Sequence, residues 1–260
     1  MAKSTATRLH VEDHLVAGAE FDPGAERSHQ LLRVLRLGAG DRVALFNAAD
    51  GEWLAEIEDR GKGRCRLRVV EQGCPALGSE AARGPWLLFA PIKRTRLEFM
   101  VEKACELGVT RLLPVITRYT DPGRVNRERL RAIVTEAAEQ CGRLSVPEVG
   151  EALPLLEVLD NWPAERSLVV CAERGEVRPI ATVPPGPAAI LIGPEGGFAP
   201  FELDRVSQLP FAFTAGLGPR VLRAETAALA ALACWQAVVG DWTVEGRESR
   251  PWLPKAKSPS

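Results

Sequence analysis

Short apolar segments alternate with amphipathic stretches along the second part of the chain, and this order constrains the fold more than any other feature of the sequence. Strands that are joined through helices run parallel, and a parallel sheet is buried on both faces. We therefore predict an α/β domain whose mostly parallel sheet is covered by helices on both sides. The strands are expected at residues 86–90, 112–116, 167–171, 188–192 and 211–215, and the helices at residues 94–107, 127–141, 200–208 and 223–239.

The first part of the chain has a different pattern, in which short strands surround one helix. The helix is expected at about residues 26–37, with Arg33 and Arg36 on one of its faces. The strands are expected at residues 7–11, 41–46, 53–58 and 64–70. A stretch rich in Gly, Pro and Ala follows, which is typical of a linker. The predicted organisation is a β-rich module over residues 1–72, a linker over residues 73–85, the α/β domain over residues 86–240 and a flexible tail over residues 241–260.

The composition limits the class of protein. Hydrophobic residues make up 46% and charged residues 26%, and no apolar run is long enough to span a membrane, so a globular chain is expected. The amino terminus lacks the apolar core of a secretion signal. The six cysteines are scattered without a C-x-x-C pair, so we expect reduced, buried thiols in a cytoplasmic protein. All three histidines lie near the amino terminus, so no metal site is predicted.

Three loops that follow expected strands form a candidate ligand site. Ligands of open α/β sheets bind beyond the carboxyl ends of the strands, and residues 172–175, 193–197 and 216–220 all lie there. One such loop would indicate only a tight turn. Three glycine-bearing loops at one end of the sheet, followed by Arg220, Arg223 and Glu225, indicate a ligand site. Neither a P-loop nor the dinucleotide pattern G-x-G-x-x-G is present, so the ligand is not expected to be held by phosphates.

A basic stripe and an alanine-rich helix each allow two interpretations. In a strand over residues 64–70, the side chains of Lys62, Arg64, Arg66 and Arg68 would line one surface. A solvated face balanced by Glu52, Glu56 and Glu58 of the neighbouring strand is favoured over an RNA-binding face. The helix at residues 223–239 has many alanines, which suit an ordinary core helix and a dimer interface equally well.

Two segments carry a resemblance to a known family. Ile190-Leu-Ile-Gly-Pro-Glu-Gly-Gly-Phe198, followed by Leu217-Gly-Pro-Arg-Val-Leu-Arg-Ala-Glu-Thr-Ala227, closely resembles the signature of the ribosomal RNA small subunit methyltransferase E family. These are SPOUT-class enzymes that methylate N3 of a uridine in 16S rRNA. The resemblance covers about residues 7–239 in the family's order. It includes residues 29–37 with Gly40 and Asp41, residues 93–99 through Gly108, and residues 136–143 with Pro147.

The resemblance implies a fold, a cofactor and partners. It implies an N-terminal PUA-like β-barrel, a SPOUT-type α/β domain with a C-terminal trefoil knot, S-adenosyl-L-methionine as methyl donor, and a homodimer that acts on 16S rRNA of the small ribosomal subunit. The residues implied for the cofactor site are Ala172, Glu173, Ile192, Gly193, Pro194, Glu195, Gly197, Leu217, Gly218, Leu222, Arg223, Glu225 and Thr226.

Catalysis and RNA binding add further candidates. Arg223 is the candidate for stabilising charge on the uracil, and Glu195 or Glu225 for the general base. An arginine–carboxylate pair that only shapes the loop is an equal alternative for Arg223. The RNA-binding candidates are Arg8, Arg33, Arg36, Lys93, Arg94 and Arg143. A non-catalytic RNA-binding or assembly factor, and a SPOUT methyltransferase with another RNA target, remain the alternative functions.

Overall fold

The chain forms two compact units. The computed structural model describes residues 5, 7–76, 78, 84–120, 125–172 and 177–243. The N-terminal unit comprises residues 1–81 with residues 138–146 and 247–260, and the C-terminal unit comprises residues 82–137 and 147–246. Residues 77 and 79–83 of the predicted linker at 73–85, and residues 244–260 of the predicted tail at 241–260, lie outside the described residues.

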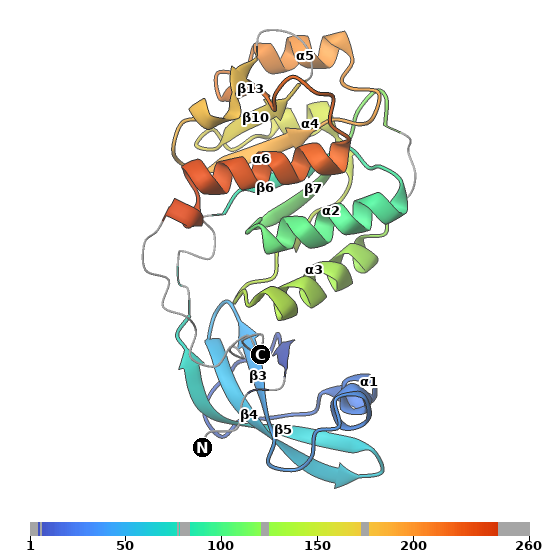
Figure 1. The fold of residues 1–260 in the computed structure, drawn as a ribbon, viewed down its shortest axis with the longest axis vertical. Coiled ribbons are helices and arrows are strands. Elements are labelled where there is room, and N and C mark those ends of the chain that lie inside the picture. Colours follow the sequence, from blue (N-terminus) through green and yellow to red (C-terminus); the bar gives the residue numbers. More distant parts are fainter. Residues whose placement is uncertain are drawn as a thin grey trace, which may run out of the picture. The chain divides into compact units, whose positions relative to one another are not determined.

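The N-terminal unit is built on a five-stranded sheet (Figure 1). Its strands follow the order β1 (Arg8–His10), β3 (Arg42–Asn47), β4 (Gly51–Gly61), β5 (Arg64–Cys74) and β2 (Glu20–Phe21). β1 pairs with β3 in parallel, and the other pairs are antiparallel. The buried core contains Leu9, Leu15, Leu31, Val43, Leu45, Ala55, Ile57, Cys65, Leu67 and Val69.

The alternation predicted for β5 is confirmed. Arg64, Arg66 and Arg68 face away from the core into which Cys65, Leu67 and Val69 point. Each arginine forms an ion pair with an acidic residue of a neighbouring strand or of the turn after β2: Arg64 with Asp22, Arg66 with Glu20 and Arg68 with Glu56 and Glu58. The stripe is therefore the charge-balanced face that was favoured. Glu52 was wrongly placed in this balance, because its side chain is buried beside Arg8.

The helix predicted at residues 26–37 is shorter and irregular. It consists of α1 (Gly24–His29) and a π-helical turn η1 (Gln30–Val34), which ends where Leu35 and Leu37 donate their backbone N–H groups to Gln30 and Leu31. Arg36 has a φ of 56°, in the left-handed region. Arg33 and Arg36 are both exposed. The prediction that they share a helix face was wrong, because Arg36 lies beyond the end of the helix.

The C-terminal unit contains the predicted parallel sheet. The strand order is β11 (Arg178–Pro179), β13 (Ala212–Gly216), β10 (Ser167–Cys171), β12 (Ala188–Ile192), β6 (Trp86–Phe89), β7 (Arg111–Ile116) and β8 (Glu148–Val149), and β9 (Leu153–Pro154) also pairs with β7. Every one of these pairs is parallel. The helices are α2 (Arg94–Glu106), α3 (Arg127–Cys141), α4 (Leu155–Asp160), α5 (Pro200–Ser207) and α6 (Ala224–Val238), with short 3-10 turns at Ile180–Thr182 (η3) and Asp241–Thr243 (η4).

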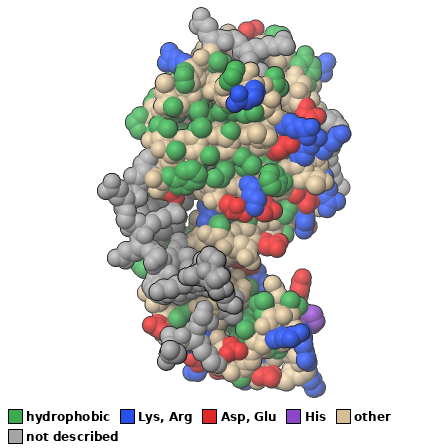
Figure 2. Space-filling view, in the orientation of Figure 1, with side chains coloured by type: hydrophobic (Ala, Val, Ile, Leu, Met, Phe, Trp, Pro, Cys, Tyr) green, Lys and Arg blue, Asp and Glu red, His purple; other side chains and the backbone are tan. Residues whose placement is uncertain are grey.

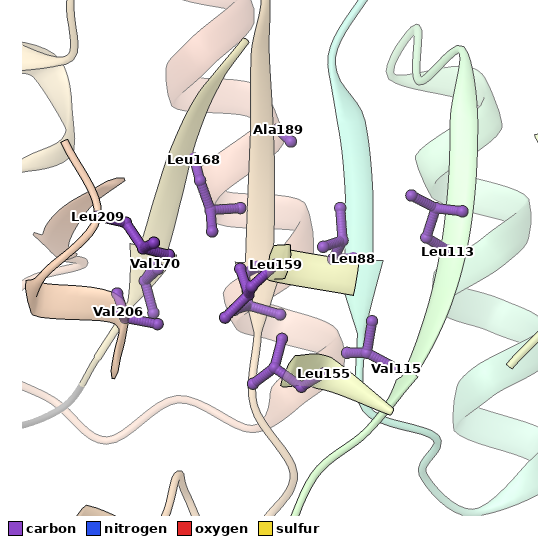
Figure 3. Packing of buried hydrophobic residues seen from close by; sticks show 11 residues of the cluster. Leu88, Leu113, Val115, Leu155, Leu159, Leu168, Val170, Ala189, Val206 and Leu209 are labelled. Atoms are coloured by element: carbon purple, nitrogen blue, oxygen red, sulfur yellow. The ribbon is translucent and has the colours of Figure 1, made fainter. Parts of the chain in front are cut away.

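Helices cover both faces of this sheet, as the sequence predicts. On one face, α4 and α5 contribute Leu155, Leu159 and Val206 to a buried cluster with strand residues such as Leu88 and Leu168 (Figure 3). On the other face, α6 lies against α2 and β12 (Figure 1). The six-residue helix α4 was not predicted from the sequence.

Two further observations concern membrane-spanning helices and the state of the cysteines. In the part of the chain that the structure describes, no helix has the length and apolar character needed to cross a bilayer. All six cysteines are free thiols, but Cys141 and Cys234 are exposed, so the prediction of uniformly buried cysteines was wrong.

Candidate active site

The three predicted loops leave the sheet at one edge. β13, β10 and β12 are parallel neighbours, and their register aligns Cys171 with Ile192 on one side and with Ala215 on the other. The chain therefore continues from three adjacent strand ends into Ala172, Gly193 and residues 216–222. Glu173, which was predicted to line the same site, lies outside the described residues.

Glycines determine the shape of two of these loops. Gly197 and Gly218 have φ angles of 72° and 97°, which side chains strongly disfavour. The Gly197 N–H donates to the carbonyl of Pro194 at 2.9 Å and closes a tight turn. A Cβ atom on Gly193 would lie 2.9 Å from the Phe198 ring, so a larger residue there would have to displace the ring. The backbone of these loops is therefore open to close approach by a ligand.

A cation that the sequence did not single out connects the two candidate bases. Arg96, in the first turn of α2, contacts Glu195 at 2.5 Å and Glu225 at 3.7 Å. Glu195 belongs to the loop after β12, and Glu225 to the first turn of α6. The fold thus brings three charged groups from separate segments to one point. The sequence signals for Arg96 were its place within residues 93–99, which resemble the family, and its position at the start of a helix that follows β6, next to β12 in the sheet.

Glu225 is the more enclosed of the two carboxylates. Its side chain is 13% exposed, against 55% for Glu195. Its Oε2 atom is buried and has no hydrogen-bond partner among the described residues. Buried polar atoms are normally satisfied, so an oxygen of this kind is available to a bound molecule.

Arg223 lies at the amino end of α6 and is exposed. Its carbonyl accepts a hydrogen bond from the Ala227 N–H at 2.8 Å. Within the described ranges, its guanidinium forms no hydrogen bond or ion pair with the protein. The arginine–carboxylate pair that was considered for Arg223 is formed by Arg96 instead.

The RNA-binding candidates have contrasting surroundings. Lys93 and Arg94 are exposed at the start of α2, where Arg94 pairs with Glu98 at 2.8 Å. Arg33 and Arg36 are exposed in the N-terminal unit. Arg143, in the same unit, donates to the Ser145 carbonyl at 3.1 Å. These contacts leave Lys93, Arg94, Arg33 and Arg36 accessible to a polyanion.

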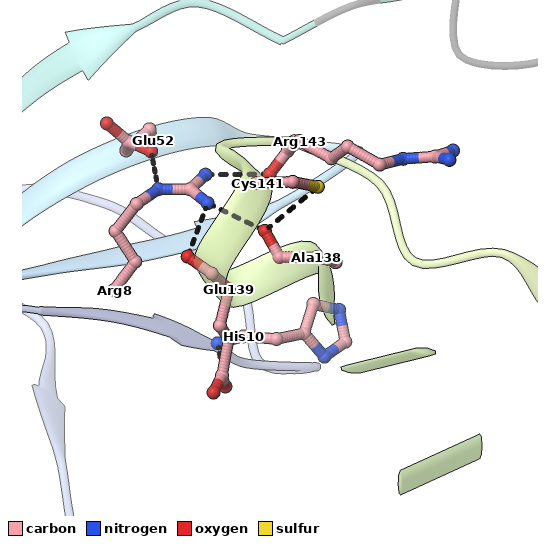
Figure 4. A network of polar contacts seen from close by, with 7 residues as sticks. All are labelled: Arg8, His10, Glu52, Ala138, Glu139, Cys141 and Arg143. Atoms are coloured by element: carbon pink, nitrogen blue, oxygen red, sulfur yellow. Dashed lines mark hydrogen bonds and ion pairs between the residues drawn. The ribbon is translucent and has the colours of Figure 1, made fainter. Parts of the chain in front are cut away.

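Arg8 must be removed from that group. It is 8% exposed, and its Nε donates to Glu52 at 2.6 Å (Figure 4). Its terminal nitrogens donate to the carbonyls of Ala138, Glu139 and Arg143 at 2.7–3.2 Å. The guanidinium therefore joins β1 to the end of α3 inside the N-terminal unit, and a phosphate cannot reach it there.

Comparisons with known proteins agree with this architecture. Residues 82–236 match the model of an RNA methyltransferase domain, and residues 23–70 match that of an RNA methyltransferase PUA domain. The ribosomal RNA small subunit methyltransferase E of Rickettsia conorii is 32% identical, over 87% of this chain and 93% of its own length. The chain belongs to the ribosomal RNA small subunit methyltransferase E family. The enzyme of that name from Bacillus subtilis is 28% identical over 82% of this chain and 88% of its own length.

Solved structures of ribosomal RNA small subunit methyltransferase E and similar proteins share the fold. The Neisseria gonorrhoeae enzyme, bound to S-adenosyl methionine, aligns with a TM-score of 0.80 and 27% identity over 91% of this chain and 99% of its own. A Legionella pneumophila protein in complex with the same cofactor aligns with a TM-score of 0.79 and 29% identity over the same shares. The mixed α/β fold with an N-terminal PUA domain is thus that of the methyltransferase E family, as the sequence signature implied.

Proposed function

We propose that this protein transfers the methyl group of S-adenosyl-L-methionine to N3 of a uridine in 16S rRNA of the small ribosomal subunit. One observation carries the proposal: in a member of this family, three adjacent parallel strands end together, beside two carboxylates joined by Arg96. Methyl transfer to rRNA takes place where ribosomes are assembled, so the proposal includes a cytoplasmic location.

The residues at the sheet edge fit the methyl donor. S-adenosyl-L-methionine has no phosphates, and the loops have no phosphate-binding motif. Backbone groups exposed by Gly193, Gly197 and Gly218 are suited to its adenine and ribose. The residues we assign to its site are Ala172, Glu173, Ile192, Gly193, Pro194, Glu195, Gly197, Leu217, Gly218, Leu222, Arg223, Glu225 and Thr226.

The chain's own groups have distinct roles in the transfer. The donor supplies an activated methyl group, so the protein must remove the N3 proton and stabilise the charge left on the uracil. Glu225 is the preferred base, because one of its oxygens has no partner among the described residues and its contact with Arg96 is the longer one. Arg223 is the preferred partner of the uracil oxygens, because its guanidinium is exposed and forms no ion pair with a carboxylate that the structure describes. Arg96 holds Glu195 and Glu225 in place.

Analysis of cellular rRNA tests the proposal. Mass-spectrometric mapping of 16S rRNA from cells that lack the protein should reveal one missing methyluridine. A wild-type copy should restore it. In purified form, Arg223→Ala should lower kcat by about 100-fold at saturating S-adenosyl-L-methionine and saturating RNA. Fully methylated 16S rRNA in the deletion cells would contradict the proposal, and a protein that binds no S-adenosyl-L-methionine in calorimetry would instead be the non-catalytic assembly factor.

We also propose where the RNA is held. Arg33, Arg36, Lys93, Arg94 and Arg143 supply cations at the surface for the phosphate backbone, and their contribution should weaken with salt. The target base must leave its stack to reach a methyl donor inside a protein loop.

We propose, further, that the protein is a homodimer that uses the outer face of α6. Apolar residues recur there at helical spacing: Ala230, Ala233, Cys234, Ala237 and Val238. Figure 2 shows hydrophobic side chains gathered over this helix. Small side chains permit close approach of a second helix. α6 follows β13 in the chain and packs against the earlier β12 and η3. The trefoil knot proposed for this C-terminal segment rests on membership of the family.

A further inference from the structure

A single exposed tyrosine lies beside the candidate active site. Tyr119 is the only tyrosine of the chain, and it is 52% exposed. It belongs to the turn that follows β7. In this turn the Thr120 N–H donates to the Thr117 carbonyl at 3.2 Å, and the Thr117 N–H donates to the Thr120 hydroxyl at 2.9 Å. Both threonines are buried, so the backbone of the turn that carries Tyr119 is held in place.

A buried carboxylate fastens this turn to the glycine-rich loop. Glu202 is 3% exposed, and it accepts hydrogen bonds from the backbone N–H groups of Arg118 and Ala199, each at 2.8 Å. Arg118 precedes the tyrosine, and Ala199 follows the loop at 193–197. Because the one carboxylate binds both segments, the backbone next to Tyr119 is tied to the residue that closely follows the loop.

The tyrosine also packs directly on the loop. A Cβ atom on Gly196 would lie 3.3 Å from the Cβ and 3.7 Å from the Cγ of Tyr119. Gly196 adjoins Glu195, which contacts Arg96 at 2.5 Å. An exposed aromatic residue therefore packs on Gly196, which is next in sequence to Glu195, one of the charged groups assigned to the reaction.

We propose that Tyr119 stacks on an unstacked base of the RNA substrate and so positions the target uridine at Glu195, Arg96 and Glu225. The inference rests on the proposed function. A base that has left its helix loses its stacking partners, and an aromatic side chain replaces them whatever the identity of the base. A half-exposed ring on a rigid turn is suited to this role, because little conformational freedom is lost when the base binds.

Substitutions that distinguish the aromatic character of Tyr119 from its bulk test the proposal. Small subunits from cells lacking the protein would be methylated by the wild type and by Tyr119→Ala, Tyr119→Leu and Tyr119→Phe. Loss of stacking should raise KM for the subunits about 10-fold in the Ala and Leu variants. The Phe variant should stay close to wild type, and all should bind S-adenosyl-L-methionine equally. A Tyr119→Leu variant as active as the wild type would overturn the proposal. A loss of affinity for S-adenosyl-L-methionine as large as the rise in KM for the subunits would also overturn it.

Ultraviolet cross-linking gives a readout that needs no turnover. The wild-type protein is irradiated with small subunits that contain 4-thiouridine, and the cross-linked peptide is identified by mass spectrometry. A cross-link at Tyr119 is expected, and its absence when other peptides of residues 84–120 are cross-linked would overturn the proposal. If Tyr119 is cross-linked but no methyl group is transferred, the proposed function fails while the stacking inference stands.

Discussion

Three arginines of this protein have three different surroundings. Arg8 is buried among carbonyls and Glu52, Arg96 joins two carboxylates, and Arg223 is exposed without a partner in the described part of the chain. A buried guanidinium whose three nitrogens all form hydrogen bonds stabilises the fold, whereas an exposed and unpaired one is available to a substrate. The role of each arginine therefore follows from its contacts and not from its residue type.

Removal of Arg8 should destabilise the protein. Arg8→Ala leaves Glu52, which is 1% exposed, as a buried charge without its partner. The free energy of unfolding should fall by about 3–5 kcal/mol, measured by denaturant unfolding. Arg33→Ala removes an exposed arginine of the same unit and should change it by less than about 0.5 kcal/mol. Equal stability of the two variants would contradict the structural role of Arg8.

The thiol of Cys171 should resist alkylation. Burial, and then the nearby Cys234 thiol, raise the pKa of Cys171 to about 12. Iodoacetamide at pH 8 should therefore modify the exposed Cys234 and leave Cys171 intact, as peptide mass spectrometry can show. The unfolded thiol ionises near a pKa of about 8.5, so this group contributes stability below that pH and loses the contribution as the pH rises toward 12. Similar labelling rates at pH 8 would contradict the shift.

The sequence indicated the loops of the candidate site but not the contacts of its charged side chains. Gly193, Gly197 and Gly218 were predicted because glycine in a loop after a strand has a recognisable spacing. Arg96 was missed, because its two carboxylates are about 100 and 130 positions away and only the fold brings them together. Arg8 was misassigned for the same reason. Long-range contacts of charged side chains have no local pattern.

At the scale of elements, Arg36 follows the π-helical turn η1 and has an uncommon backbone conformation with a positive φ angle. Positive φ angles in non-glycine residues are rare and concentrate at functional sites. Among the described residues only Arg36 and Lys62 have them, and Lys62 lies in the turn between β4 and β5. Since Arg36 is also exposed, its backbone strain is consistent with a side chain presented to RNA.

A matched pair of glycine variants tests this role. Arg36→Gly and Lys62→Gly both relieve left-handed strain, so each should leave stability unchanged or raise it by up to about 1 kcal/mol. Only Arg36→Gly should weaken binding to small subunits, and it should lower the slope of log affinity against log salt by about 1. The slope is measured by filter binding over a salt series. An identical slope for both variants would remove Arg36 from the interface.

Elements with a strong pattern were predicted well, and short ones were not. The helices of the C-terminal unit were expected within two residues of their ends, because thirteen or fifteen residues carry a clear period, as in α2 and α6. The six residues of α4 are too few for such a period. The left-handed residue that ends the first helix was missed because arginine gives no sign of it.

At the scale of the whole molecule, the proposed dimer predicts a surface that tolerates no charge. Ala237→Arg introduces a cation on the outer face of α6 and should convert the dimer into a monomer in sedimentation equilibrium. Ala132→Arg makes the same change at an exposed alanine of α3 and should leave the dimer intact. A monomeric wild type, or dissociation in both variants, would contradict the assigned interface.

The N-terminal unit includes residues 138–146, which follow residue 81 only after a long stretch of the other unit. On the ribosome, its sheet cannot acquire all the carbonyls that Arg8 binds until residue 143 has been synthesised. The delay is 143 − 81 = 62 residues, or about 3–12 s at about 5–20 residues per second. During that interval the guanidinium has no carbonyl partners there, so the N-terminal unit cannot complete this network before residues 82–137 of the other unit have been synthesised.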